Sequence, residues 1–170
     1  MNPRSLGGFV ALAVFVADQA AKTALLLSSD EWSGRSMPLV PFLDLVLRWN
    51  RGISFSLFVQ DSLAGRIALL GLTLGAVALF AWWLSNCRAA LAAAGLGAII
   101  GGALGNAFDR ILHGAVVDYL DLHLFGRHLF VFNLADGAIN VGVALLMIDL
   151  VFVPRAVRSR PHSTSRWGEN

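Results

Sequence analysis

The sequence is short of charged residues. Asp, Glu, Lys and Arg make up 14% of its 170 residues and 56% are hydrophobic, whereas charged residues form about 25% of a typical soluble domain. Together with a mean hydropathy of +0.67, this scarcity places the chain among membrane proteins. A chain of this length holds a few membrane spans and little else. We therefore expect any chemistry to be carried out by the spans and their short connections.

Cysteine and the common catalytic motifs are also scarce or absent. Cys87 is the one cysteine, which excludes an internal disulfide and a cysteine metal cluster. The chain has no HExxH motif and no serine in a nucleophile elbow. His113, His123 and His128 lack the spacing of metal ligands on one helix, so we expect no metal and no other cofactor. The basic residues lie beside apolar segments, which argues against a nucleic-acid partner.

Four apolar segments are each long enough to cross a membrane, which takes about 20 residues as a helix. They cover residues 6–27, 63–84, 89–112 and 131–153. We interpret the first as a retained span rather than a cleaved signal peptide, because Asp18 and Lys22 interrupt it and no small-x-small cleavage site follows. The expected fold class is an all-α integral membrane protein with four transmembrane helices.

The arginines are unevenly distributed along the chain. Arg4, Arg88 and the four arginines near the C-terminus flank the spans on one side, whereas loop 28–62 carries three arginines against four acidic residues. The positive-inside rule makes the first side cytoplasmic, so we expect both termini inside and this loop in the periplasm. Residues 1–153 are expected to form one membrane domain, and residues 154–170 a basic, disordered cytoplasmic tail.

Two segments between the spans are more than plain linkers. The stretch "PLVPFLDLVLRWNRGISFSLF" (38–58) is rich in β-branched and aromatic residues. We expect it to form two short strands joined by a turn at "NRG", as a small β-rich cap on the periplasmic side. The stretch "HGAVVDYLDLHLFGRHLF" (113–130) is amphipathic, and we expect it to lie across the outer mouth of the bundle.

Polar residues occur inside three of the four apolar segments. In the predicted topology they share one depth, in the outer half of the membrane, and their spacing places those of each segment on one helix face. Polar groups in a membrane are costly and usually mark function or pairing. The set comprises Asp18, Lys22, Asn106, Asp109, Arg110, Asn133, Asp136 and Asn140.

Other unusual residues of the spans are expected to be structural. Arg66 and Asp149 lie near span ends, where their side chains can reach the membrane surface, so we assign them no role. Gly97, Gly101 and Gly105 form a row of small residues along the third span, which is typical of close helix packing.

Two carboxylates stand where a reaction at the membrane surface is possible. Asp118 follows the third span, and Asp136 lies at the outer end of the fourth. Two carboxyl groups brought together share one proton. One of them can then act as a general base on a water molecule while the other donates to a carbonyl oxygen. This is the arrangement of an aspartic protease.

The residues alone leave other interpretations open. The carboxylates could instead be separate and paired with Arg110 and Lys22. Lys22 could form a serine–lysine dyad with a serine of "GISFS", although Asp18 lies one helical turn away from it. A proton-coupled transporter with four spans could use Asp136 or Asp18 as proton carrier. Such a transporter predicts carboxylates near the midplane and a minimal outer loop, unlike this chain.

Five motifs occur in order across residues 9–150: "VADQAAK", "NRGISF", "GGALGNAFDR", "GAVVDYLD" and "FNLADGAINVG". As a set they resemble the bacterial lipoprotein signal peptidases, the type II signal peptidases. The resemblance implies a four-span aspartic endopeptidase of the inner membrane. Such an enzyme cleaves prolipoproteins before the diacylglyceryl-modified cysteine of the lipobox and is inhibited by globomycin. Prolipoproteins and membrane lipid are therefore the implied partners, and we expect a monomer.

The resemblance also assigns roles by position. Asp118 of "GAVVDY" and Asp136 of "FNLAD" match the two catalytic aspartates. Gly137 departs from the pattern, since the family commonly has a small hydroxyl residue after the second aspartate. The implied supporting residues are Asp18, Lys22, Asn50, Asn106, Asp109, Arg110 and Asn133.

Overall fold

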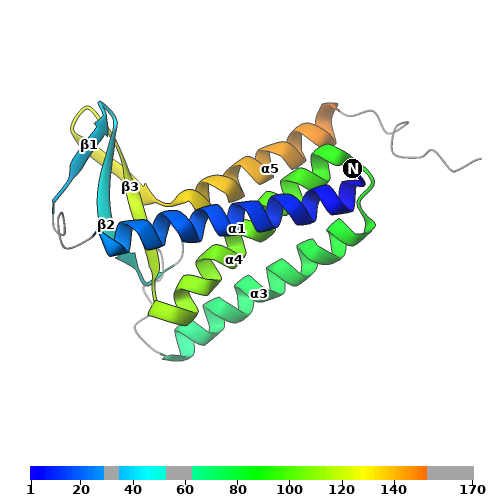
Figure 1. Ribbon diagram of the computed structural model, residues 1–170, viewed down its shortest axis with the longest axis horizontal. Coiled ribbons are helices and arrows are strands. Elements are labelled where there is room, and N and C mark those ends of the chain that lie inside the picture. Colours follow the sequence, from blue (N-terminus) through cyan, green and yellow to red (C-terminus); the bar gives the residue numbers. More distant parts are fainter. Residues whose placement is uncertain (29–34, 53–62, 153–170) are drawn as a thin grey trace, which may run out of the picture.

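The computed structural model describes residues 1–28, 35–52 and 63–152. Within these residues four helices are long and apolar enough to cross a membrane, which confirms the four predicted spans. They lie side by side, with the N-terminus at the end opposite the β-sheet (Figure 1). The helices are α1 (Pro3–Leu27), α3 (Leu63–Asn86), α4 (Ala90–His113) and α5 (Leu134–Phe152).

Helix α4 is the centre of the bundle and packs against α1, α3 and α5. Glycines make its close contacts possible: a Cβ on Gly97 would meet the carbonyl oxygen of Gly7 in α1, and one on Gly101 would meet that of Ala11. A larger side chain at either position would push the helices apart. The predicted packing role of the small-residue row is thereby confirmed at these two positions.

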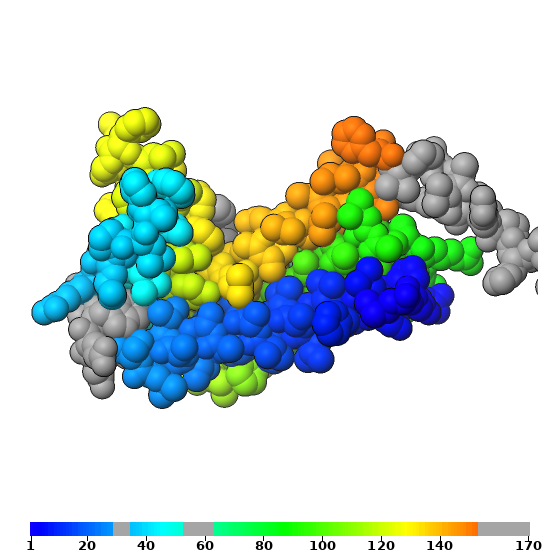
Figure 2. Space-filling view, turned by 45° about the horizontal axis from the view of Figure 1, so that its top comes forward, coloured from blue at the N-terminus to red at the C-terminus, as the bar shows by residue number. Residues whose placement is uncertain are grey.

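A four-stranded antiparallel sheet in the order β1-β2-β3-β4 stands at one end of the bundle. In Figure 2 it rises above the helices, and the surface over α5 lies lower beside it. The sheet confirms the predicted β-rich cap. Its strands are β1 (Met37–Val40), β2 (Leu43–Asn50), β3 (Val116–Leu124) and β4 (Arg127–Phe132).

The cap is larger than predicted, because segment 113–130 supplies two of its strands. Leu124 pairs with Arg127 across a two-residue turn. The turn residues Phe125 and Gly126 both have positive φ, at 50° and 75°, as a type I′ hairpin requires. An amphipathic segment fits a strand at a water boundary as well as a surface helix, so its character alone did not identify the hairpin.

The structure contains one hairpin turn that the sequence did not predict. Strands β1 and β2 are joined at residues 41–42, where Pro41 suits a turn. The motif "NRG" instead lies at the end of β2, which closes at Asn50. The predicted second strand after "NRG" and the predicted tail 154–170 lie outside the described residues. The fourth helix begins at Leu134 rather than residue 131, because the preceding residues belong to β4.

Candidate active site

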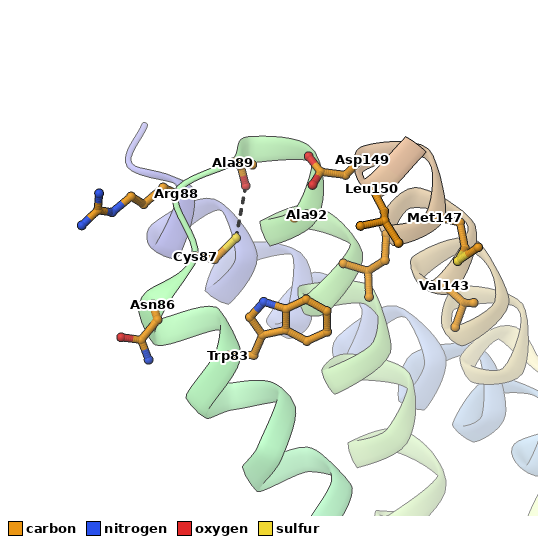
Figure 3. A pocket seen from close by; sticks show the side chains of 11 residues that line it. Trp83, Asn86, Cys87, Arg88, Ala89, Ala92, Val143, Met147, Asp149 and Leu150 are labelled. Carbon is orange, nitrogen blue, oxygen red and sulfur yellow. Dashed lines mark hydrogen bonds between the residues drawn. The ribbon is translucent and has the colours of Figure 1, made fainter. Parts of the chain in front are cut away.

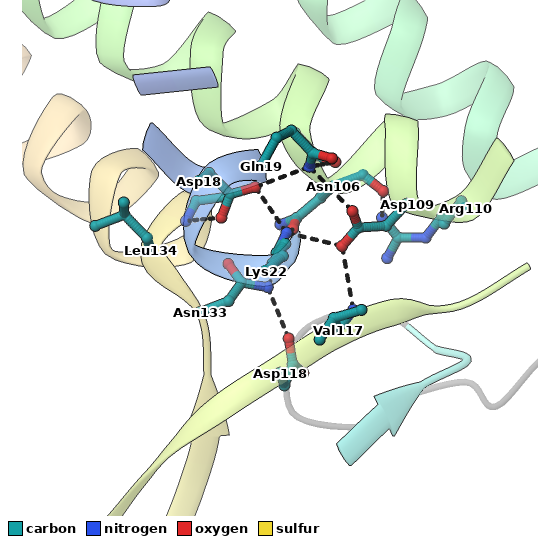
Figure 4. Close-up of polar contacts among 12 residues, drawn as sticks. Asp18, Gln19, Lys22, Asn106, Asp109, Arg110, Val117, Asp118, Asn133 and Leu134 are labelled. Carbon is teal, nitrogen blue, oxygen red and sulfur yellow. Dashed lines mark hydrogen bonds and ion pairs between the residues drawn. The ribbon is translucent and has the colours of Figure 1, made fainter. Parts of the chain in front are cut away.

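A lysine between two carboxylates joins α1 to α4 at the end of the bundle that carries the sheet (Figure 4). Lys22 Nζ lies 2.8 Å from Asp18 Oδ2 and 2.8 Å from Asp109 Oδ2. The three side chains are 2%, 0% and 2% exposed. Burying these charges is favourable only because each is paired and hydrogen-bonded. The polar residues predicted to share one depth on these two helices do come together.

Gln19 also belongs to this cluster and was not among the predicted site residues. Its Nε2 lies within 3.2 Å of Asp18 Oδ2, 3.0 Å of Asp109 Oδ1 and 3.2 Å of the Gly105 carbonyl oxygen. The amide thus links the two carboxylates that hold Lys22. Its position next to Asp18 was the available signal, but only the packing of α1 on α4 reveals the partners.

Two asparagines connect the lysine cluster to the predicted catalytic aspartates. Asn106 Oδ1 accepts hydrogen bonds from Lys22 Nζ and from Asn133 Nδ2, each at 3.1 Å. Asn106 Nδ2 donates to Asp136 Oδ1 at 2.8 Å, and Asn133 Nδ2 donates to Asp118 Oδ1 at 2.7 Å. Each aspartate is therefore held by an amide that is itself fixed by the other asparagine.

Asp136 is held at the first turn of α5 by a reciprocal cap. Its backbone N–H donates to Asn133 Oδ1 at 2.9 Å, and its Oδ2 accepts from the Asn133 N–H at 3.4 Å. This is the arrangement of a capping box. The neighbouring Ala135 N–H donates to Asp18 in α1 at 3.0 Å, and the Leu134 N–H to the Tyr119 hydroxyl at 3.2 Å. The helix end is therefore fixed to both α1 and β3.

Asp118 reaches the same place from the sheet. It lies in β3 opposite Arg48 of β2, and its Oδ2 accepts from Asn50 Nδ2 at 2.9 Å. The adjacent Val117 N–H donates to Asp109 Oδ2 in α4 at 3.1 Å, which fixes this part of β3 to the bundle. Asn133 contacts both aspartates, through its amide N–H to Asp118 and its carbonyl to the Asp136 backbone.

The surroundings of Asp118 favour its protonated form. Its pKa is raised from 3.8 to about 6, mainly by burial and also by the negative charge of Asp136. The hydrogen bonds from Asn50 and Asn133 act in the opposite direction, because they stabilise the carboxylate. A carboxyl group tuned in this way can hold or release a proton near neutral pH.

The two cations do not pair with these aspartates as the alternative interpretation supposed. Among the described residues, Lys22 forms ion pairs with Asp18 and Asp109. Arg110 donates to the backbone carbonyl oxygens of Asn106 at 3.2 Å and of Gly52 at 3.0 Å. Within the described residues Arg110 thus ties α4 to the chain after β2, and the alternative pairing of Arg110 with Asp118 or Asp136 is not found.

Three further expectations need correction. Asp121 follows Asp118 along the amphipathic segment 113–130 and was predicted from this position to stay solvated, but it is 5% exposed, and its Oδ2 lies 2.7 Å from His128 Nδ1. Asn140 was expected to join the polar face of the fourth span, yet it is exposed. Asp149 was expected at the membrane surface and is 4% exposed instead.

Space for a ligand adjoins Asp118. A cavity of about 360 Å³ is lined by Asp118 and Asn50, together with Trp49 and residues 129–131 of β4. A larger cavity of about 460 Å³ lies at the opposite end of the bundle (Figure 3). It is mostly apolar, with Trp83 on one side and Met147 on the other, and it is remote from Asp118 and Asp136. We take the smaller one as the candidate site.

The comparisons with known proteins decide the family. The family model described as "Signal peptidase (SPase) II" matches residues 10–152. The chain belongs to the signal peptidase II family. Among its relatives, the lipoprotein signal peptidase of Beijerinckia indica is 48% identical over 149 residues, covering 88% of this chain and 89% of that one. The lipoprotein signal peptidase of Methylobacterium sp. is 43% identical over 152 residues, covering 89% and 92%.

The fold agrees with this assignment. A solved structure described as a bacterial membrane enzyme superposes with a TM-score of 0.74 and 25% identity, covering 85% of this chain and 86% of that one. The chain is thus an aspartic peptidase of the signal peptidase II family. The space beside Gly137 is open, since a Cβ there would meet no described atom within 4 Å. A small hydroxyl residue, as is common in the family, would therefore also fit at this position.

Proposed function

We propose that the chain is a membrane aspartic endopeptidase in which Asp118 and Asp136 form the catalytic dyad. It removes the signal peptide of prolipoproteins by cleaving before the diacylglyceryl-modified cysteine. The observation that carries this proposal is that one buried asparagine, Asn133, hydrogen-bonds to both aspartates. The site needs no metal for this chemistry, and no group of three or more metal-ligating side chains gathers in the described residues.

In the proposed mechanism the two carboxyl groups share one proton. The ionised carboxylate takes a proton from a water molecule, whose oxygen attacks the scissile carbonyl carbon. The protonated partner donates to the carbonyl oxygen and gives a tetrahedral intermediate. As the C–N bond breaks, a proton passes to the leaving amine. The pKa of about 6 at Asp118 suits a group that exchanges its proton in each step.

The other polar residues are positioning residues in this proposal. Asn50, Asn106 and Asn133 donate to the dyad and orient its oxygens. The cluster of Lys22 with its two carboxylates fixes α1 against α4 beneath them. A preorganised set of donors lowers the reorganisation needed during the reaction. The proposed supporting set is Asp18, Lys22, Asn50, Asn106, Asp109, Arg110 and Asn133.

We further propose that the sheet lies on the periplasmic side of the inner membrane and both termini in the cytoplasm. The distribution of arginines supports this orientation. The dyad then lies where the outer helix ends meet the sheet, at the boundary with water. A diacylglyceryl anchor in the outer leaflet would hold the scissile bond at this depth. Globomycin is the expected inhibitor, and a monomer suffices for the site.

The test is cleavage of a diacylglyceryl-modified prolipoprotein by purified variants. Asp118→Asn and Asp136→Asn should fold and bind globomycin but lose at least about 10³-fold in kcat, because either change removes the shared proton's exchange partner. Asp121→Asn is the matched control, since it makes the same change on the same strand and should cleave at nearly the wild-type rate. An unmodified prolipoprotein should be a very poor substrate.

Two outcomes would contradict the proposal. Full activity of Asp136→Asn together with an inactive Lys22→Ala enzyme would favour a serine–lysine mechanism, whose candidate serines lie outside the described residues. Proton uptake coupled to solute transport, without cleavage, would favour the transporter alternative.

A further inference from the structure

A second polar region lies at the sheet end of the bundle, between the start of α3 and the end of α4. Two cavities of about 410 and 430 Å³ meet there, and Arg66 and His113 line both of them. The first is also lined by Trp49, whose ring lies 5.4 Å from the His113 ring in an edge-on arrangement. None of these three residues contributes to the proposed dyad.

Arg66 is the unusual member of this region. Its Nε is buried and has no hydrogen-bond partner among the described residues, which is costly for an N–H group of a charged side chain. The guanidinium lies over the glycine that ends α4: a Cβ on Gly114 would come within 2.8 Å of Arg66 Nη1. Gly114 also has a φ of +70°, so both its backbone conformation and the approach of Arg66 favour glycine.

The residues that line the two cavities combine positive charge with an apolar wall. Arg51 lines the first cavity and Arg110 the second, and no acidic residue lines either cavity among the described residues. Next to the cations the second cavity is bounded by aliphatic side chains of α3 and α4. These are Leu63, Ile67, Leu70 and Ile111. Ile67 and Ile111 are 61% and 60% exposed, so this wall faces the surroundings of the bundle.

We propose that this region binds the phosphate group of an anionic phospholipid. The unpartnered N–H of Arg66 and the His113 ring would contact phosphate oxygens, which arginine binds well. An acyl chain would lie along the aliphatic wall below. Basic pockets beside membrane helices are a known means of binding lipid headgroups. The apolar wall favours a lipid over free phosphate, because only a lipid would cover it. This region borders the candidate active site, since Trp49 lines cavities in both and Arg110 belongs to the proposed supporting set. Arg66 and His113 have no part in the proposed reaction, and the lipid proposal does not depend on it.

The test compares lipids retained by the full-length protein. Wild-type protein and variants are placed in nanodiscs of equimolar phosphatidylglycerol and phosphatidylcholine, released into detergent and examined by native mass spectrometry. Wild type should retain phosphatidylglycerol in preference to phosphatidylcholine. Arg66→Gln should lower this preference about fivefold, as expected for one cation near a headgroup. Arg66→Lys should keep part of it.

The matched control is Arg127→Gln, which removes an exposed arginine at the same end of the molecule. It should retain phosphatidylglycerol like wild type. An equal loss in Arg127→Gln, or no loss in Arg66→Gln, would overturn the proposal. If Arg66→Gln fails to fold, thermal unfolding of the wild-type protein provides the test. Phosphatidylglycerol should raise its unfolding temperature more than phosphatidylcholine does. An equal rise with inorganic phosphate alone would also refute the lipid assignment.

Discussion

Replacing Lys22 by methionine removes one charge from the most buried ion cluster in the part of the chain that the structure describes. Lys22 holds Asp18 and Asp109 at 2.8 Å each, and all three side chains are at most 2% exposed. Methionine fills a similar volume but leaves two carboxylates without their cation. Removing one partner of a buried pair costs about 3–5 kcal/mol. For a chain of this size that corresponds to a fall in the unfolding temperature of roughly 6–20 °C.

The measurement is thermal unfolding of the purified protein in detergent, followed alongside cleavage at a temperature where both proteins are folded. The double variant Lys22→Met/Asp109→Asn should recover part of the lost stability, because it removes one of the unpaired charges. The amide oxygen introduced by Asp109→Asn could still accept the hydrogen bond that the carboxylate now accepts from the Val117 N–H. Arg127→Met, at an exposed position, is the control and should change the unfolding free energy by no more than about 0.5 kcal/mol.

An unfolding temperature of Lys22→Met equal to that of wild type would refute this account of the cluster. So would a Lys22→Met protein of normal stability that is completely inactive, since Lys22 would then act on the substrate. Comparing activity with stability also distinguishes the role of Lys22 from that of Asp136. The variant Asp136→Asn should lose activity without the large loss of stability expected for Lys22→Met.

Two further predictions concern the proton of Asp118 and the orientation in the membrane. Asn50→Ala removes a hydrogen bond that stabilises the Asp118 carboxylate, so it should raise this pKa and move the corresponding limb of the pH–kcat/KM profile about one unit to alkaline pH. Ser36→Ala, which removes a donor to Asp44, should leave the profile in place; a fall in rate without a shifted limb would mean that Asn50 acts on the substrate. Topology reporters should read outside, inside, outside and inside when fused after residues 40, 86, 122 and 160, and a periplasmic C-terminus would contradict the proposed orientation.

Several features of the site follow from local sequence. The four spans were predicted within a few residues, because long apolar helices are specified by composition over about 20 residues. The depth shared by Asp18, Asn106 and Asp136 followed from span length and direction. The capping box of Asn133 and Asp136 was also visible in principle as an "N-x-x-D" sequence at the start of an apolar run.

Other features were decided by packing between distant segments. The strands β3 and β4 exist as part of a sheet with β2, and an amphipathic segment does not reveal its strand partners. The sequence spacing favoured a pair of Lys22 with Asp18, but Asp109 joins it from a different helix, far along the chain. Arg110 was matched to a carboxylate, and the fold gives it two backbone carbonyls instead.

The sequence by itself thus determined which groups are brought to one end of the helix bundle, and the tertiary structure decided which of them touch. Helical periodicity fixes the face and depth of each side chain. It carries no information about the rotation of one helix against another, which here depends on the close contacts at Gly97 and Gly101. A hydrogen bond needs partners within about 3 Å. Asn133 caps Asp136 locally at the start of α5, but its contact with Asp118 arises only once α5 and the sheet are packed together.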